Sequence, residues 1–187
     1  WPEDDRAADL KVREHGGQNR GDEVAGYIER AGGDPDNYPP WCMYFARDCH
    51  LRAAAELGLQ TDCPKTGGAA KCWIKAGEQG LLRLLPNGAS YGSDRAIGEP
   101  GMYAPAPGDI AIFGRPSEGT RGRDIIRRDR RRKGHAAVVV SYAGGAFVDT
   151  VDGNTNKRGS REGDGVYAKR YPLIAPHLVG FVRPTAA

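Results

Sequence analysis

The sequence has no apolar run close to the roughly 20 residues that a membrane-spanning helix needs. Its first residues, WPEDDRAADL, are acidic and lack the hydrophobic segment of a signal peptide, and the chain does not begin with methionine. There is no internal repeat and no low-complexity linker. We therefore expect no transmembrane segment and no signal peptide. The 187 residues fit one domain, 1–187, which is long enough to bury a sizeable core.

The chain also lacks the cysteine and histidine spacings of a metal site. Its four cysteines contain no CxxC pair, and its four histidines are scattered, so a structural zinc site is not expected. Four cysteines do not make a disulfide framework in a chain of this length. Pairing of Cys63 with Cys72 in an oxidising compartment stays open. We expect no bound metal and no cofactor.

The chain has no net positive charge outside one segment. Residues 121–133, RGRDIIRRDRRRK, hold seven Arg and one Lys against two Asp, a local charge of +6 in a chain whose net charge is +3. Such a run is usually a solvated loop. The alternative is a docking patch for an anionic wall polymer, lipid headgroup or nucleic acid, although no aromatic residues interleave it for base stacking. The candidate contacts are Arg127, Arg128, Arg130, Arg131 and Arg132.

Glycine and proline are abundant, with 27 and 13 residues, and favour loops and strands over a helical bundle. Amphipathic patterns predict helices in a first half of about 4–80, and β-branched or aromatic runs predict strands in a second half of about 108–184. This order is typical of one α+β domain with an antiparallel sheet. The expected helices are 4–13, 41–57, 66–76 and the one in GDEVAGYIERAGG, and the five expected strands lie in GDIAIFG, HAAVVVSYA, GAFVDTVDGN, GVYAKRY and LVGFVRP, with a hairpin turn at YAGGAF.

In the predicted helix at 41–57, apolar residues recur at helical spacing and predict a buried stripe. Asp48, Arg52 and Glu56 lie opposite at steps of four, which predicts a solvated face. The stripe comprises Cys42, Phe45, Ala46, Cys49, Ala53 and Leu57.

The stretch NYPPWCMYFARDC places Cys42 on the first turn of this helix, after two prolines and Trp41. The unpaired N–H groups and the dipole at a helix N-terminus lower a thiol pKa and stabilise an oxyanion. Burial as a small apolar residue is the alternative, and it suits Cys49, which has no such context. We take Cys42 as the candidate nucleophile, with Trp41 shielding one side of the thiol.

A catalytic thiol needs a base and a group that fixes the tautomer of that base. His135 is the first residue of a hydrophobic strand in KGHAAVVV, just past a glycine, where a side chain can reach a cleft from the rim of a sheet. His15 lies in a glycine-rich turn, His50 in mid-helix and His177 in a proline-bounded loop. We expect these three histidines at the surface.

Asp152 and Asn154 end the next predicted strand, in VDTVDGNTN. Strand side chains alternate, so both can face the same way, and either can accept the imidazole N–H. Asp-Gly-Asn is also good turn chemistry. The order Cys, His, Asn along the chain favours the catalytic interpretation.

Taken together, REHGGQNRG, VAGYIERAGG, YPPWCMYFARDC, PKTGGAA, APGDIAIFG, GHAAVVVS and VDGNTN resemble the CHAP family. These are cysteine, histidine-dependent amidohydrolases/peptidases of the wider NlpC/P60, papain-like group. The resemblance runs from about residue 10 to 172 and implies a papain-like α+β fold, with Cys42 as nucleophile and His135 as base. Asp152 stands where the family usually has Glu, and Asn154 matches its Asn, so the residue that orients His135 stays open.

The resemblance further implies cleavage of an amide bond in peptidoglycan peptides, as in endolysins, tail-associated hydrolases and secreted bacteriolytic wall enzymes. We expect an amidase or endopeptidase that acts on the cell wall outside the cytoplasm, with peptidoglycan as partner and Tyr38 and Trp41 as candidate substrate-binding residues. Three alternatives stay open. They are a cysteine acyltransferase, an injected antibacterial effector with an immunity protein as partner, and a non-catalytic wall-binding module that uses the Arg-rich segment.

The segment DPDNY, just before the candidate nucleophile, has the oxygen groups of a calcium loop. Asp34, Asp36 and the carbonyl of Tyr38 alternate as possible ligands, and some members of the resembling family bind calcium there. The further acid and the glycine of an EF-hand are missing. We expect a turn at this segment.

Overall fold

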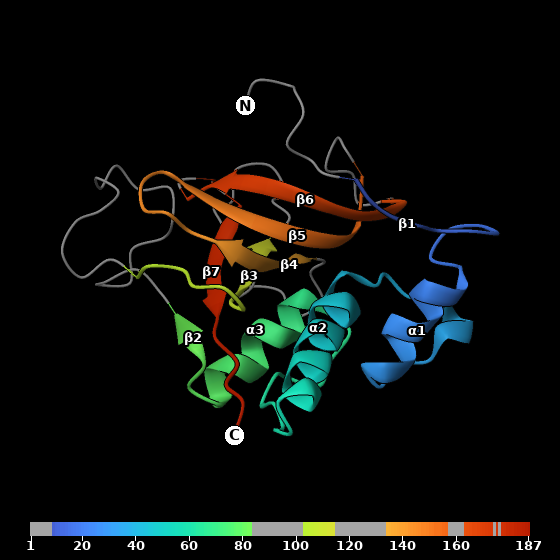
Figure 1. The fold of residues 1–187 in the computed structure, drawn as a ribbon, viewed down its shortest axis with the longest axis horizontal. Helices are drawn as coiled ribbons and strands as arrows, with labels where there is room; N and C mark the ends of the chain where they lie inside the picture. The colour runs from blue at the N-terminus through green and yellow to red at the C-terminus, as the bar shows by residue number, and fades with distance from the viewer. Residues whose placement is uncertain (1–8, 84–102, 115–133, 157–162, 174, 176) are drawn as a thin grey trace.

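The computed structural model describes residues 9–83, 103–114, 134–156, 163–173, 175 and 177–187 (Figure 1). Within these residues the helices lie in the first half of the chain and most strands in the second, so the α+β prediction is confirmed. The helices are α1 (Asp22–Arg30), α2 (Cys42–Glu56) and α3 (Ala69–Glu78), with a short 3-10 helix η1 (Pro35–Asn37). The strands are β1 (Asp9–Arg13), β2 (Leu82–Arg83), β3 (Ile110–Gly114), β4 (Gly134–Ser141), β5 (Phe147–Thr155), β6 (Gly165–Pro172) and β7 (Leu178–Val182).

The described strands form one antiparallel sheet in the order β1-β6-β5-β4-β3-β7-β2. The predicted count of five strands is therefore wrong, because β1 and β2 extend the sheet at its two edges. The helix expected at 4–13 is also wrong over residues 9–13, where β1 pairs with β6. Leu10 and Val12 alternate with polar residues there, which is the period of a strand. Residues 4–8 lie outside the described part.

The hairpin turn expected at YAGGAF is confirmed. It joins β4 to β5, and Gly144 and Gly145 both have positive φ, at 86° and 89°. Two successive residues in this region favour glycine strongly, because a side chain is strained there.

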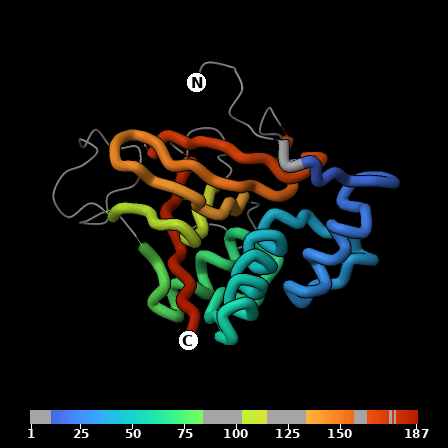
Figure 2. Tube along the Cα trace, in the orientation of Figure 1, coloured from blue at the N-terminus to red at the C-terminus, as the bar shows by residue number. Residues whose placement is uncertain are grey.

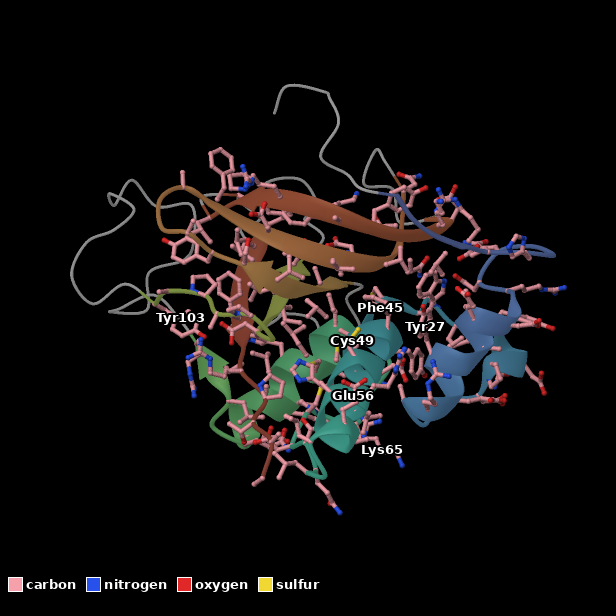
Figure 3. All side chains as sticks on the ribbon, in the orientation of Figure 1. Tyr27, Phe45, Cys49, Glu56, Lys65 and Tyr103 are labelled. Carbon is pink, nitrogen blue, oxygen red and sulfur yellow. The ribbon has the colours of Figure 1, made fainter. Side chains whose placement is uncertain are left out.

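The helices pack on one face of the sheet, and the core extends to both faces (Figure 1). Strand β3 shows this alternation: Ile110 and Ile112 pack with α2 and α3, whereas Ala111 and Phe113 pack in a second cluster on the opposite face. A third cluster joins α1 to the start of α2, and Tyr27 meets Phe45 edge to face with ring centroids 5.2 Å apart (Figure 3).

The buried stripe predicted for α2 is correct only in the first half of the helix. Cys42, Phe45 and Ala46 are buried, but Leu57 is 71% exposed because the end of α2 extends beyond the core. The solvated face predicted for Asp48 is wrong. Asp48 is buried, and its carboxylate accepts bonds from Arg30 of α1, at 2.6 Å from Nε and 3.1 Å from Nη2.

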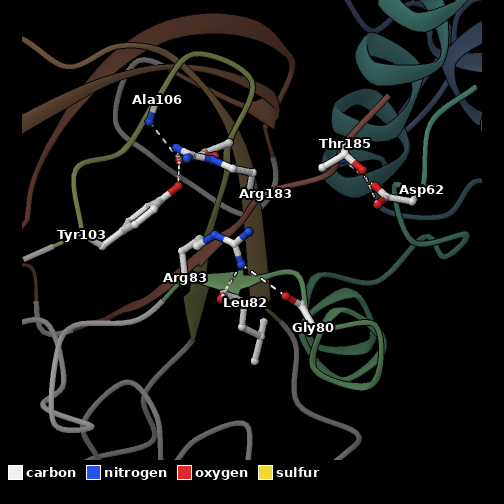
Figure 4. A network of polar contacts seen from close by, with 9 residues as sticks. Asp62, Gly80, Leu82, Arg83, Tyr103, Ala106, Arg183 and Thr185 are labelled. Carbon is white, nitrogen blue, oxygen red and sulfur yellow. Dashed lines mark hydrogen bonds and ion pairs between the residues drawn. The ribbon is translucent and has the colours of Figure 1, made fainter. Parts of the chain in front are cut away.

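The end of the chain returns to the helical layer, beside the loop between α2 and α3 (Figure 2). Gln60 and Ala187 exchange backbone hydrogen bonds at 3.0 Å, and Asp62 accepts from the backbone and hydroxyl of Thr185. Nearby, the carboxylate of Asp109 binds the Arg183 guanidinium and the hydroxyl of Tyr103 (Figure 4). The contacts of Asp109 fix the segment that enters β3.

None of the described helices combines the length and the apolar composition required to cross a membrane. The Arg-rich segment at 121–133 lies outside the described residues.

Candidate active site

Cys42 is the first residue of α2, so the prediction that it lies on the first turn of a helix is confirmed. Its side chain is 7% exposed, and Trp41, the N-cap residue, makes no side-chain capping bond. The N–H groups of the first helical turn have no acceptor within the helix. Cys42 therefore lies where its sulfur and a bound oxyanion can both receive backbone hydrogen bonds.

The Cys42 thiol interacts with a part of β4 that lies beyond the end of the ladder between β4 and β5. The ladder between β4 and β5 starts at the pair Val138↔Val151, whereas β4 pairs with β3 already from Gly134. Backbone hydrogen bonding from Ala136 of β4 and from Met43 is among the causes that lower the pKa of the Cys42 thiol. The backbone N–H group of Ala136 is therefore not used in the ladder between β4 and β5 and can donate to the thiol.

A glycine allows α2 to lie this close to the sheet. A Cβ atom on Gly153 would stand 2.6 Å from both Cβ and Cγ of Phe45 and 2.8 Å from Cζ3 of Trp41. The Asp-Gly-Asn sequence accordingly lies within β5, and its glycine is the surface on which the first turns of α2 pack.

His135 lies between Cys42 and Asp152. Its Nε2 is 2.8 Å from Oδ2 of Asp152, which leaves Nδ1 as the ring nitrogen for its hydrogen bond to Cys42. The imidazole is 17% exposed and the Asp152 side chain has no exposed surface. The three side chains form one line from the helix start through β4 to β5.

Two hydroxyl groups complete the surroundings of Asp152. Tyr171 donates to Oδ2 at 2.7 Å, and Thr150 donates to Oδ1 at 2.6 Å. Between the two candidates that the sequence left open, Asp152 is the one that binds His135. Asn154 is buried with a positive φ of 55°, and its Oδ1 has no hydrogen-bond partner within the described residues.

The electrostatics of the pair favour a thiolate beside an imidazolium. Burial raises the pKa of the Cys42 thiol, but the hydrogen bond and charge of His135 and the two backbone N–H groups outweigh it and lower that pKa. Burial lowers the pKa of His135, but its bonds to Asp152 and Cys42 and their charges raise it to about 10. The two titrations are coupled, so both shifts belong to the pair.

The pKa values of the other three cysteines are shifted in the opposite direction. Burial raises the pKa of Cys49 to about 11 and that of Cys63 to about 12, and it raises the pKa of Cys72 further. These thiols stay protonated at neutral pH, so Cys42 is distinct among the four cysteines.

Trp41 does not have the accessible position expected of a substrate-binding residue. Its side chain has no exposed surface, its ring lies 5.8 Å from that of Tyr27, and its indole N–H donates to Glu14 Oε1 at 2.8 Å. The expectation of direct contact with substrate is therefore corrected, because burial makes Trp41 a support for the start of α2.

Tyr38 is 43% exposed, and the guanidinium of Arg20 lies 4.0 Å from the centre of its ring. Its contact with substrate stays a prediction.

The turn expected at DPDNY is confirmed. Asp34 accepts from the backbone N–H of Asp36 at 3.0 Å and from Asn37 Nδ2 at 2.6 Å, which caps η1. The Tyr38 carbonyl accepts from Asn19 Nδ2 at 2.8 Å. No group of three or more His, Cys, Asp or Glu side chains within the described ranges is arranged to hold a metal ion.

Sequence reasoning missed several residues around the site, among them Tyr171, Thr150 and His177. His177 is half-buried, and its ring centroid lies 5.5 Å from that of Phe113, which in turn lies 6.2 Å from that of His135. Burial and the charge of His135 lower the pKa of His177. The surface position predicted for it is wrong, and so is that of His50, whose Nε2 is buried without a partner in the described structure.

Comparison with family models, curated proteins and solved structures returns no significant match.

Proposed function

We propose that this protein is a cysteine hydrolase that cleaves an amide bond of peptidoglycan stem peptides or cross-bridges. The observation that carries the proposal is the line from Cys42 through His135 to Asp152, with the thiol on the first turn of a helix and its pKa lowered. A thiolate, a base and an orienting group are the parts that covalent amide hydrolysis requires.

The proposed reaction begins with the Cys42 thiolate attacking the scissile carbonyl carbon. The backbone N–H of Cys42 donates to the oxyanion. The tetrahedral intermediate then collapses, the C–N bond breaks, and Nδ1 of His135 gives its proton to the leaving amine. Water attacks the resulting thioester with His135 as base, and the acid product leaves as the thiolate–imidazolium pair is restored.

The substrate class and the papain-like assignment rest on the resemblance to the CHAP family. That resemblance is supported by the order of the parts: a cysteine at a helix start, a histidine at a strand start and an acid on the next strand. Peptidoglycan as substrate places the activity at the cell wall, outside the cytoplasm.

The test is mass spectrometry of purified peptidoglycan after incubation with wild type, Cys42→Ala and Cys49→Ala. Wild type and Cys49→Ala should give the same new fragments, and the fragment masses identify the bond. Cys42→Ala should give none while keeping a folded-state circular dichroism spectrum, because the side chain lies at the edge of the core. Full turnover by Cys42→Ala would overturn the mechanism, and inactive wild type would overturn the substrate class.

A further inference from the structure

The carboxylate of Asp152 has more donors than a base-orienting residue needs. It accepts from His135 at 2.8 Å and Tyr171 at 2.7 Å on Oδ2, and from Thr150 at 2.6 Å on Oδ1, with no exposed surface. We propose that Tyr171, with Thr150, is a positioning residue of the site that spreads the charge of Asp152, so that the His135 imidazolium can release its proton to a leaving amine. The proposal rests on the function proposed above.

The fold explains how Tyr171 reaches this position. Tyr171 pairs with Val148 across β5 and β6, which puts it on the same face of the sheet as Asp152, four residues farther along β5. Its ring packs on Phe113, with centroids 4.5 Å apart, and the hydroxyl extends to Asp152. A rigid aromatic anchor therefore holds the donor at one oxygen of the carboxylate.

Tyr171 acts as a permanent donor at this site. Burial and the neighbouring Asp152 charge raise the pKa of its hydroxyl, which thus stays protonated at every pH where the protein works. A protonated phenol beside a carboxylate can only donate to it. Thr150 is fully buried, and its hydroxyl has the same role at the other oxygen.

The negative charge of Asp152 determines how tightly the His135 imidazolium holds its proton. A buried carboxylate without these donors would exert its full field on His135 and hold the imidazolium proton more tightly. An acid that is too weak transfers its proton slowly to the leaving group. Hydroxyl donation to Asp152 therefore weakens its hold on that proton while leaving the ring oriented.

Other titratable groups face this network and remain in place in the test variants. Cys42 faces His135 from α2, and His177 lies near it from the segment before β7. Lys169 of β6 interacts with Asp152 through its charge and donates to the carbonyl of Asn156 at 2.6 Å.

The experiment is an NMR titration of the His135 ring in a Cys42→Ala background, which removes the coupled thiol. Tyr171→Phe should raise the pKa of His135 by about half a unit to one unit, because one charge-assisted hydrogen bond to its partner is lost. Thr150→Val should raise it in the same direction, and Thr150→Ser, which keeps the hydroxyl, should not. Tyr142→Phe is the matched control, because the Tyr142 hydroxyl donates to Gly145 in the hairpin turn.

With Cys42 intact, Tyr171→Phe should lower kcat roughly three- to tenfold and move the alkaline limb of the pH–rate profile upward. A variant that loses thermal stability but titrates like its parent would show that Tyr171 only packs, and the proposal would be overturned. If Tyr171→Phe does not fold, the His135 pKa measured in Thr150→Val and in Thr150→Ser tests the proposal instead. Because the titration needs no substrate, inactivity of wild type on peptidoglycan would refute the proposed function without changing this result.

Discussion

Replacing Gly153 by alanine tests how the start of α2 is held against the sheet. The added Cβ would stand 2.6 Å from Cβ and Cγ of Phe45, where ordinary contacts lie between 3.4 and 4 Å. The Cβ of Phe45 is fixed to the backbone of α2 and cannot rotate away. The helix must therefore move away from β5 by about 1 Å to accept the new methyl group.

That displacement should change both the stability of the fold and the reactivity of Cys42. Overpacking of this kind costs about 1–3 kcal/mol of unfolding free energy. That cost exceeds the gain of roughly 0.5–1 kcal/mol that alanine brings in place of glycine within a strand. Cys42 moves with the helix, away from His135 and Ala136, which lower its pKa. The thiolate fraction at neutral pH, and with it the alkylation rate, should fall about tenfold for each unit by which that pKa rises. The loss of reactivity should thus exceed the loss of stability.

The assay combines urea unfolding with the rate at which iodoacetamide alkylates Cys42 at neutral pH. Gly77→Ala is the matched control, since Gly77 is exposed within α3 and its nearest contact for a Cβ is Leu82 Cδ1 at 3.4 Å. That variant should gain about 0.5–1 kcal/mol and alkylate like wild type. If Gly153→Ala were as stable and as reactive as wild type, the close packing of α2 on β5 would not position the thiol.

Two further predictions concern buried polar groups of α2. Asp48→Asn should lower the free energy of unfolding in urea by about 2 kcal/mol, a figure kept small because the partner Arg30 is half-exposed. Glu56→Gln, on the exposed side of α2, should change it by no more than about 0.5 kcal/mol. An equal effect of both would refute the buried pairing. Burial lowers the pKa of His50 below 6.5, so the folded state resists the proton that the unfolded state takes up. Stability should fall as pH drops below about 6.5. The loss of stability with falling pH should be smaller in His50→Gln than in wild type. An equal loss in both proteins would contradict the role of His50.

The sequence was sufficient to predict the elements that carry the site. Local patterns predict Cys42 at a helix start and His135 at a strand start, because proline, glycine and hydrophobic periodicity depend on local structure. Whether Asp152 or Asn154 faces His135 was not decidable, since both have the same strand parity and the choice depends on a bulge between Asp152 and Thr155.

The errors arose where a residue's surroundings come from distant parts of the chain. Asp48 looked solvent-facing within α2, but its partner, Arg30, belongs to α1. Trp41 looked accessible beside the thiol, but α1 and Glu14 cover it. Nothing in the local sequence near His177 indicates that the β6–β7 connection brings it beside Phe113.

The pKa of Cys42 depends on β4 and β5, strands that lie far from it in the sequence. The sulfur of Cys42 has its neighbours only after α2 has docked on strands that are synthesised much later than the helix. Until then the thiol has an ordinary pKa, near 8.5, and little nucleophilic power at neutral pH. The lowered pKa of the thiol, on which the proposed hydrolysis depends, is therefore a property of the packed domain and is absent from the nascent or partly unfolded chain.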